Sequence, residues 1–153
     1  MTDKEIFREL FDLAEASKSS HVVVAAGLVR GGKLLLSSVS FGTPHRHAED
    51  LLLEKIKMQN IEINSGDALY VTLQPCGYRA PRGDWEGHGD CTTKIINSPI
   101  KKVVYAFPDS QYSVGADERL EKAGVGSSLV DDAEVKEEAQ KIFNSAPLHK
   151  DYI

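Results

Sequence analysis

The chain has 153 residues, a length that suits one domain with a hydrophobic core, so we predict a single domain over residues 1–153. Hydrophobic residues make up 41% of it and charged residues 27%, which are ordinary values for a soluble globular protein. The formal net charge of −5 argues against binding to duplex nucleic acid, since such proteins usually carry a basic excess, and it favours a small-molecule partner.

The N-terminus predicts a cytoplasmic protein without a membrane partner. It begins with charged residues and has no apolar signal core. No apolar run in the chain is long enough to span a bilayer. The two cysteines, Cys76 and Cys91, would pair as a disulfide in a secreted protein. In a reducing compartment we expect them to bind a metal ion or to remain free thiols.

The first half of the chain predicts a helix, a β-hairpin and a second helix. Apolar residues recur at helical spacing near the N-terminus, and the run HVVVAAGLVR is typical of a strand that is buried on both faces. Two adjacent glycines then signal a hairpin turn. In chain order we expect a helix over 3–17, strands over 21–30 and 33–40 joined at Gly31-Gly32, a loop over 41–46 and a helix over 47–59.

The second half alternates strands with helices. The run ALYVTLQ is strongly apolar and β-branched, and the stretch after Cys76 is rich in Gly, Arg and Asp. Gly124 is placed to end a helix, and Asp131 or Asp132 to begin the last one. In chain order we expect a strand over 68–74, a loop over 77–90, a helix over 91–98, a strand over 101–107, a helix over 116–124, a strand over 128–130 and a helix through about 143.

This order predicts an α/β fold, with a mixed sheet of about five strands, an opening β-hairpin and helices on the faces of the sheet. Ligands in open α/β sheets tend to bind beyond the carboxyl ends of the strands. Two motifs are expected there: His47-Ala48-Glu49 at a loop-to-helix junction, and Pro75-Cys76 just after a strand. Cys91 begins a further short helix, where a helix N-terminus favours a thiolate.

One imidazole and two thiolates are a ligand set for catalytic zinc, because they leave the fourth position open for water. Zinc lowers the pKa of such a water toward neutrality, and a carboxylate such as Glu49 can then move protons. His47 and Glu49 are two positions apart and cannot share one helix face, so both can approach an ion only beyond the first turn of the helix. The sequence therefore predicts a Zn²⁺ site made by His47, Cys76 and Cys91.

The pattern H-A-E, then P-C, then a second Cys resembles the cytidine and deoxycytidylate deaminase superfamily. The resemblance implies a three-layer α/β/α fold, His47, Cys76 and Cys91 as zinc ligands, and Glu49 as the proton shuttle. It also implies that backbone groups at Ala48 and near Cys76 hydrogen-bond the amidine of a heterocyclic substrate. The implied reaction is hydrolytic removal of an exocyclic amino group, and the implied assembly is a homodimer.

The two cysteines are separated by 14 residues, whereas most superfamily members separate them by two. This long separation resembles the riboflavin-biosynthesis pyrimidine deaminases, without their reductase domain. The segment YVTLQPC resembles the strand of that branch that ends in T-L-E-P-C, with Gln74 in place of Glu, and the later segments IKKVVYAFPDS and EVKEEAQKIFN are also similar. His21 stands where that branch carries a ring-binding Asn, and an imidazole offers a different hydrogen-bond pattern. The substrate is therefore expected to be a small aminopyrimidine-type heterocycle, without a commitment to the riboflavin intermediate.

Four residues are candidates for binding the substrate, each with a structural alternative. Trp85 could stack on a ring or anchor the long loop. Arg79 and Arg82 could bind a phosphate or remain solvated, and His21 could contact the base or pack beside its strand. Lys94 is expected to be a surface residue.

Two other functions stay open at this point. The first is deamination of a nucleoside, a nucleotide or a base in single-stranded nucleic acid, which the acidic charge balance disfavours. The second is a structural zinc site or a non-catalytic binding module. A structural site would need a fourth ligand, for which His45 or His88 is available.

Overall fold

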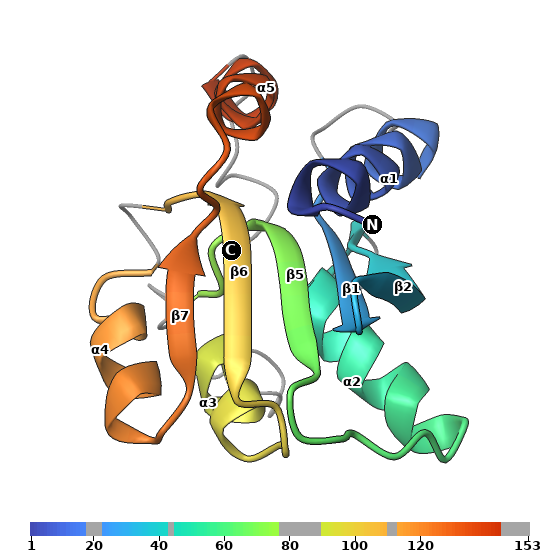
Figure 1. Cartoon of the computed structure of the whole chain (residues 1–153), viewed down its shortest axis with the longest axis vertical. Coiled ribbons are helices and arrows are strands. Elements are labelled where there is room, and N and C mark those ends of the chain that lie inside the picture. Colours follow the sequence, from blue (N-terminus) through green and yellow to red (C-terminus); the bar gives the residue numbers. More distant parts are fainter. Residues whose placement is uncertain (18–22, 43–44, 77–89, 110–112, 145–153) are drawn as a thin grey trace.

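Five strands form one mixed sheet, as predicted, and their order in the sheet is β2-β1-β5-β6-β7 (Figure 1). The computed structural model describes residues 1–17, 23–42, 45–76, 90–109 and 113–144. β1 pairs antiparallel with both β2 and β5, whereas β5, β6 and β7 run parallel to one another. The five strands are β1 (Ala25–Arg30), β2 (Lys33–Val39), β5 (Ala68–Leu73), β6 (Lys102–Phe107) and β7 (Gly126–Leu129).

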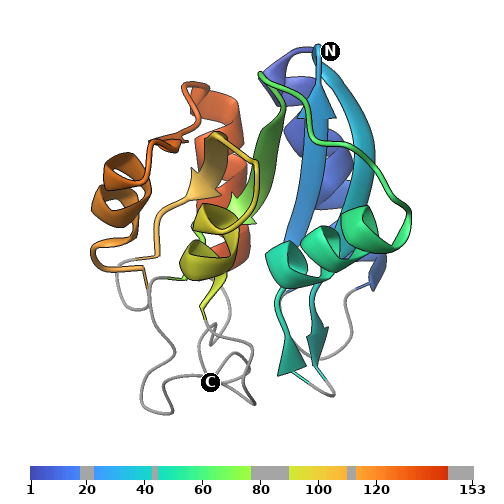
Figure 2. The same ribbon diagram turned by 90° about the horizontal axis from the view of Figure 1, so that it is seen from below.

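Helices cover both faces of this sheet, which confirms the three-layer α/β/α arrangement (Figures 1 and 2). α1 packs on β1, β2 and β5 and touches α5, which packs on β6. On the other face α2 packs on β1 and β2 and touches α3, while α4 packs on β7 and α3. The helices are α1 (Asp3–Ser17), α2 (Ala48–Met58), α3 (Cys91–Ile96), α4 (Ala116–Lys122) and α5 (Ala133–Asn144). None of the described helices is long and apolar enough to cross a membrane.

The central strands are buried because their side chains are apolar on both faces. All six residues of β5 are buried, as are the first five of β1. The apolar stripe of α1 covers one face of these strands, with Ile6, Phe7 and Leu10 at most 1% exposed. Gly27 in β1 faces this helix and the neighbouring strand, where an added Cβ would lie 2.3 Å from Cδ1 of Leu34. The continuous apolar runs therefore predicted the interior of the sheet correctly.

The segment 41–46 was predicted to be a loop, and that prediction was wrong at its two ends. It contains β3 (Phe41–Gly42) and β4 (His45–Arg46), which pair antiparallel as a small second sheet. Strands of two residues are too short to show an alternating pattern, so the sequence contains no signal for them.

The predicted helix caps are largely confirmed. The Oδ1 atom of Asp132 accepts a hydrogen bond of 3.0 Å from the backbone N–H of Val135, so Asp132 rather than Asp131 begins α5. Gly124 has a φ of 82°, the left-handed conformation that glycine commonly adopts just after a helix. Other element ends differ from the prediction by a few residues, which is the usual uncertainty of helix and strand boundaries.

An ion pair between the half-exposed Arg30 and the buried Asp67 joins β1 to the start of β5. Arg30 donates to both carboxylate oxygens of Asp67, at 3.0 and 2.8 Å, and the backbone N–H of Asn64 donates to the same carboxylate at 2.7 Å. Asp67 is 2% exposed. The hydrogen bond from Arg30 is the main cause that lowers the pKa of Asp67 below its ordinary 3.8, while burial acts in the opposite direction.

This lowered pKa predicts how the stability of the protein depends on pH. A carboxyl whose pKa is lower in the folded state stabilises the fold above its unfolded pKa, and it loses that contribution as pH falls through its folded pKa. We expect Asp67→Asn to lower the free energy of unfolding at pH 7. The difference from wild type should narrow as the pH falls below about 4. Urea unfolding between pH 7 and pH 2 measures this, and a constant difference would contradict it.

Candidate active site

His47 is the residue directly before α2, and its side chain does not cap the helix. Its backbone is extended, with φ −81° and ψ 150°, and its ring makes no capping hydrogen bond to the helix. The Nδ1 atom lies 3.2 Å from Sγ of Cys91 and 3.6 Å from Sγ of Cys76. The three side chains are buried, with 8%, 1% and 6% of His47, Cys91 and Cys76 exposed. The imidazole therefore faces both sulfur atoms from outside the first turn of its helix.

The two cysteines are also joined through the backbone. Cys76 lies three residues beyond the end of β5, and Cys91 is the first residue of α3. The backbone N–H of Cys91 donates to Sγ of Cys76 at 3.3 Å, and that of Thr92 donates to the carbonyl of Cys76 at 3.1 Å. The hydrogen bond with Cys91, together with the nearby His47 imidazole, lowers the pKa of Cys76 well below that of a free thiol, against the effect of burial. The site thus favours a thiolate at Cys76.

The three side chains fit a zinc ion. Their ligand atoms all lie within 4.8 Å of one another. Zinc bonds of about 2.1 Å to nitrogen and 2.3 Å to sulfur, arranged as a tetrahedron, put neighbouring ligand atoms about 3.6 Å apart. The two distances from Nδ1 of His47 to the sulfur atoms, 3.2 and 3.6 Å, agree with this spacing. One nitrogen and two sulfur donors are also a donor set that zinc prefers.

Polar contacts fix the helix that presents Cys91. The carboxylate of Asp90 caps α3 by accepting from the backbone N–H of Thr93 at 2.7 Å. Arg119 in α4 donates to the hydroxyl of Thr93 at 2.7 Å and lies 3.4 Å from Asp90. The N-terminus of α3 is therefore held at a defined position, with Cys91 on it.

Two carboxylates lie in the first turn of α2, immediately after His47. Glu49 is 3% exposed and Asp50 is 8% exposed. Asp50 forms an ion pair of 2.7 Å with Lys94 in α3, which ties the two helices together. The side chain of Lys94 is 21% exposed, so this residue lies partly at the surface, and its ammonium group is held by the ion pair. This pair spans 44 positions in the chain, and nothing in the local sequence signals it.

The other candidates divide into two groups. Ala48 is fully buried as the first residue of α2. His45 lies in β4. The remaining candidates all fall outside the described residues, and these are His21, Arg79, Arg82, Trp85 and His88.

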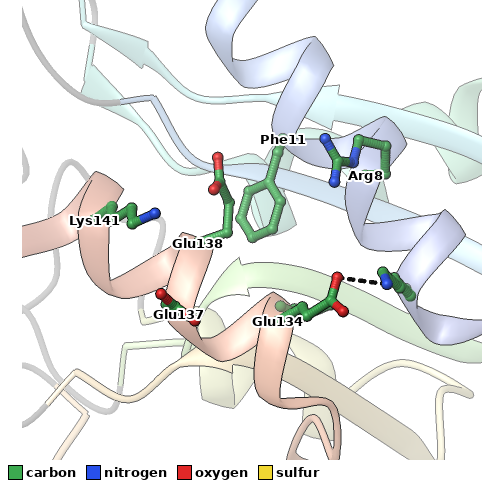
Figure 3. A pocket seen from close by; sticks show the side chains of 8 residues that line it. Arg8, Phe11, Glu134, Glu137, Glu138 and Lys141 are labelled. Carbon is green, nitrogen blue, oxygen red and sulfur yellow. Dashed lines mark ion pairs between the residues drawn. The ribbon is translucent and has the colours of Figure 1, made fainter.

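A pocket between α1 and α5 lies on the face of the sheet opposite α2 and α3 (Figure 3). Side chains of both signs line it, and Lys4 of α1 pairs with Glu134 of α5 at 2.5 Å. This pocket has no part in the site around His47, because the sheet lies between them.

Comparison with known proteins identifies the family. Residues 1–107 match the family described as the cytidine and deoxycytidylate deaminase zinc-binding region. The chain belongs to this deaminase family. The zinc-dependent deaminase predicted from the H-A-E and P-C motifs is thereby confirmed at the level of the family, and the three converging ligands agree with its zinc-binding character. No curated protein matches this sequence.

Solved structures share its fold. The diaminohydroxyphosphoribosylaminopyrimidine deaminase/5-amino-6-(5-phosphoribosylamino)uracil reductase of Thermotoga maritima is similar with a TM-score of 0.68 and 23% identity, over 92% of this chain and 40% of that one. The dCMP deaminase of cyanophage S-TIM5 gives 0.57 and 23%, over 85% and 100%. A structure from a study of tRNA:A34 deaminases gives 0.59 and 20%, over 90% and 99%.

At these identities the similarity concerns the fold alone. The present chain spans 40% of the length of the bifunctional Thermotoga maritima protein. The three structures come from proteins named for different substrates, so the fold does not determine a substrate for this chain.

Proposed function

We propose that this deaminase hydrolytically removes the exocyclic amino group of a small aminopyrimidine-type or related heterocycle. The observation that carries the proposal is the convergence of His47, Cys76 and Cys91, with the buried carboxylate of Glu49 two residues after the histidine. A structural zinc site usually fills all four positions with Cys or His. Among the described residues only these three gather, which favours a catalytic site with one open position.

In the proposed chemistry the zinc ion activates water, and residues of the chain transfer protons. Zinc held by His47, Cys76 and Cys91 would supply a Lewis acid that lowers the pKa of a water in its open position. Glu49 would accept a proton from the attacking water and give it to the ring nitrogen of the amidine. It would then carry a second proton to the leaving amine, so that water and the amidine become a ring carbonyl and ammonia. Burial of Glu49 supports this role, because a carboxylate shielded from bulk water exchanges its proton with the reacting groups rather than with solvent.

Substrate contacts are part of the proposal. Backbone groups at Ala48 and near Cys76 would hydrogen-bond the amidine. Trp85 would stack on the ring, His21 would contact the base, and Arg79 and Arg82 would bind a phosphate if the substrate carries one. We also propose that the protein is cytoplasmic and forms a homodimer. Light scattering of the purified protein tests the dimer by measuring its molecular mass.

An ammonia-release screen tests the substrate class. The panel contains free aminopyrimidines, their ribosyl phosphates, cytidine, dCMP, guanine and a single-stranded oligonucleotide, and zinc content is measured on the same sample. We expect zinc at about one ion per chain and release from a free or phosphorylated small heterocycle. Release from the oligonucleotide alone would show a nucleic-acid deaminase instead. Bound zinc without release from any compound would favour a binding module.

A further inference from the structure

The backbone that presents Cys76 is fixed by a buried amide two residues earlier. Gln74 is 9% exposed and lies between β5 and Pro75. Its carbonyl oxygen Oε1 accepts from the backbone N–H of Asp109 at 3.0 Å, and its nitrogen Nε2 donates to Oδ1 of Asp117 at 3.2 Å. Its backbone N–H donates to the carbonyl of Phe107 at 2.9 Å. Gln74 is therefore attached both to the end of β6 and to the first turn of α4.

A serine completes the attachment from the same side. The hydroxyl of Ser113, which is 4% exposed, lies 2.8 Å from the carbonyl oxygen of Pro75 and 3.2 Å from that of Gln74. The backbone N–H of Ser113 in turn donates to the carbonyl of Asp109 at 3.2 Å. The two residues directly before Cys76, Gln74 and Pro75, are thus held by hydrogen bonds to residues that lie 35 to 39 positions further along the chain.

Asp117 determines which side chain can stand at position 74. Its carboxylate already accepts from the hydroxyl of Ser127 at 2.7 Å and from that of Tyr105 at 2.8 Å. A partner at position 74 must therefore donate to this carboxylate, while its other end must accept from the N–H of Asp109. A glutamine amide does both at once. A carboxylate there would lie against Asp117 and repel it.

We propose that Gln74 is a positioning residue of the zinc site, which acts through Asp117 and Asp109 to fix the direction in which Cys76 presents its sulfur. The proposal rests on the zinc site of the proposed function. Partners that orient metal ligands commonly change metal affinity by about 10–100-fold when they are lost. The amide at position 74 donates to the carboxylate at position 117, and the two groups can be exchanged by placing the carboxylate at position 74 and the amide at position 117.

The test is a reciprocal exchange of these two side chains. Zinc affinity is measured by chelator competition, and ligand geometry by the visible spectrum of the cobalt-substituted protein. We expect Gln74→Glu to weaken zinc binding by about 10–100-fold and to alter the cobalt spectrum. The double variant Gln74→Glu with Asp117→Asn restores one donor and one acceptor, and it should bind zinc within about threefold of wild type with the wild-type spectrum. Gln74→Met keeps the volume of the side chain, removes both side-chain hydrogen bonds and adds no charge, so it should also weaken zinc binding. It serves as the test if Gln74→Glu does not fold.

Tyr105→Phe is the matched control. It removes a hydrogen bond to the same Asp117 carboxylate but leaves the bond to Gln74. We expect it to lower the melting temperature while zinc affinity stays within about threefold of wild type. The positioning role would be overturned if zinc affinity fell in proportion to melting temperature across all variants. It would also be overturned if Gln74→Glu or Gln74→Met kept the zinc affinity and the cobalt spectrum of wild type. Failure of the wild-type protein to bind zinc would overturn the proposed function itself, which is a separate result.

Discussion

Glu49→Gln should retain zinc and lose ammonia release. The amide has almost the same shape as the carboxylate but cannot accept and return a proton at neutral pH. A positioned acid or base commonly contributes about 10²–10⁴-fold to the rate, so we expect kcat to fall by at least about 100-fold. Because Glu49 is not one of the three residues whose ligand atoms gather, zinc content should remain that of wild type. Steady-state ammonia release and metal analysis on the same protein measure both quantities.

The control for this variant is the same substitution five residues later, at an exposed position of the same helix. Glu54 lies in α2 and is exposed. Glu54→Gln changes the net charge by the same amount and should leave kcat within about twofold of wild type, since surface substitutions have small effects. Equal activity of Glu49→Gln and wild type would refute the proposed proton transfer, whatever the zinc content.

Cys91→Ala should abolish tight zinc binding and the stabilisation that zinc provides. A ligand that binds only the folded state at 1,000 times its dissociation constant adds about 4 kcal/mol to the free energy of unfolding. Wild-type protein should therefore melt at a lower temperature after chelation. We expect the melting temperature of Cys91→Ala to be insensitive to the chelator, and its zinc affinity to be lower by more than about 100-fold. Differential scanning calorimetry with and without chelator measures this response.

Thr92→Val is the matched control for that experiment. Thr92 is the next residue of α3 and is fully buried, and its hydroxyl has no hydrogen-bond partner among the described residues. Replacing it by a side chain of the same shape removes a buried polar group without opening a cavity. This variant should keep the wild-type response to chelation. A Cys91→Ala protein that responds to chelation like wild type would show that this sulfur is not a ligand.

The elements with long local patterns could be predicted from the sequence. In α1 the buried residues recur at helical spacing, and in β5 every residue is buried, so the apolar pattern within each segment is enough to predict it. The paired strands β3 and β4 could not be predicted, because their two residues each give no period to detect. The end of α3 at Ile96, before the predicted 98, depends on hydrogen bonding that the composition of the segment does not determine.

The three residues that gather at the candidate site could also be predicted, whereas the contacts that support them could not. His47, Cys76 and Cys91 are recognisable because few residue types bind zinc, and these three precede or follow predicted elements. The contacts of Gln74 with Asp117 and of Asp50 with Lys94 join residues 43 and 44 positions apart. Such contacts depend on how strands and helices pack against one another, which a single sequence does not specify.

The hydrogen bonds from Cys91 and Thr92 back to Cys76 have a consequence for how this protein can change over time. They join the residues on either side of the 14-residue segment between the cysteines, and they do not depend on the sequence of that segment. The entropy needed to close a loop grows only slowly with its length. Insertions and deletions between Cys76 and Cys91 are therefore expected to accumulate at little cost in stability, because these hydrogen bonds keep the two cysteines together.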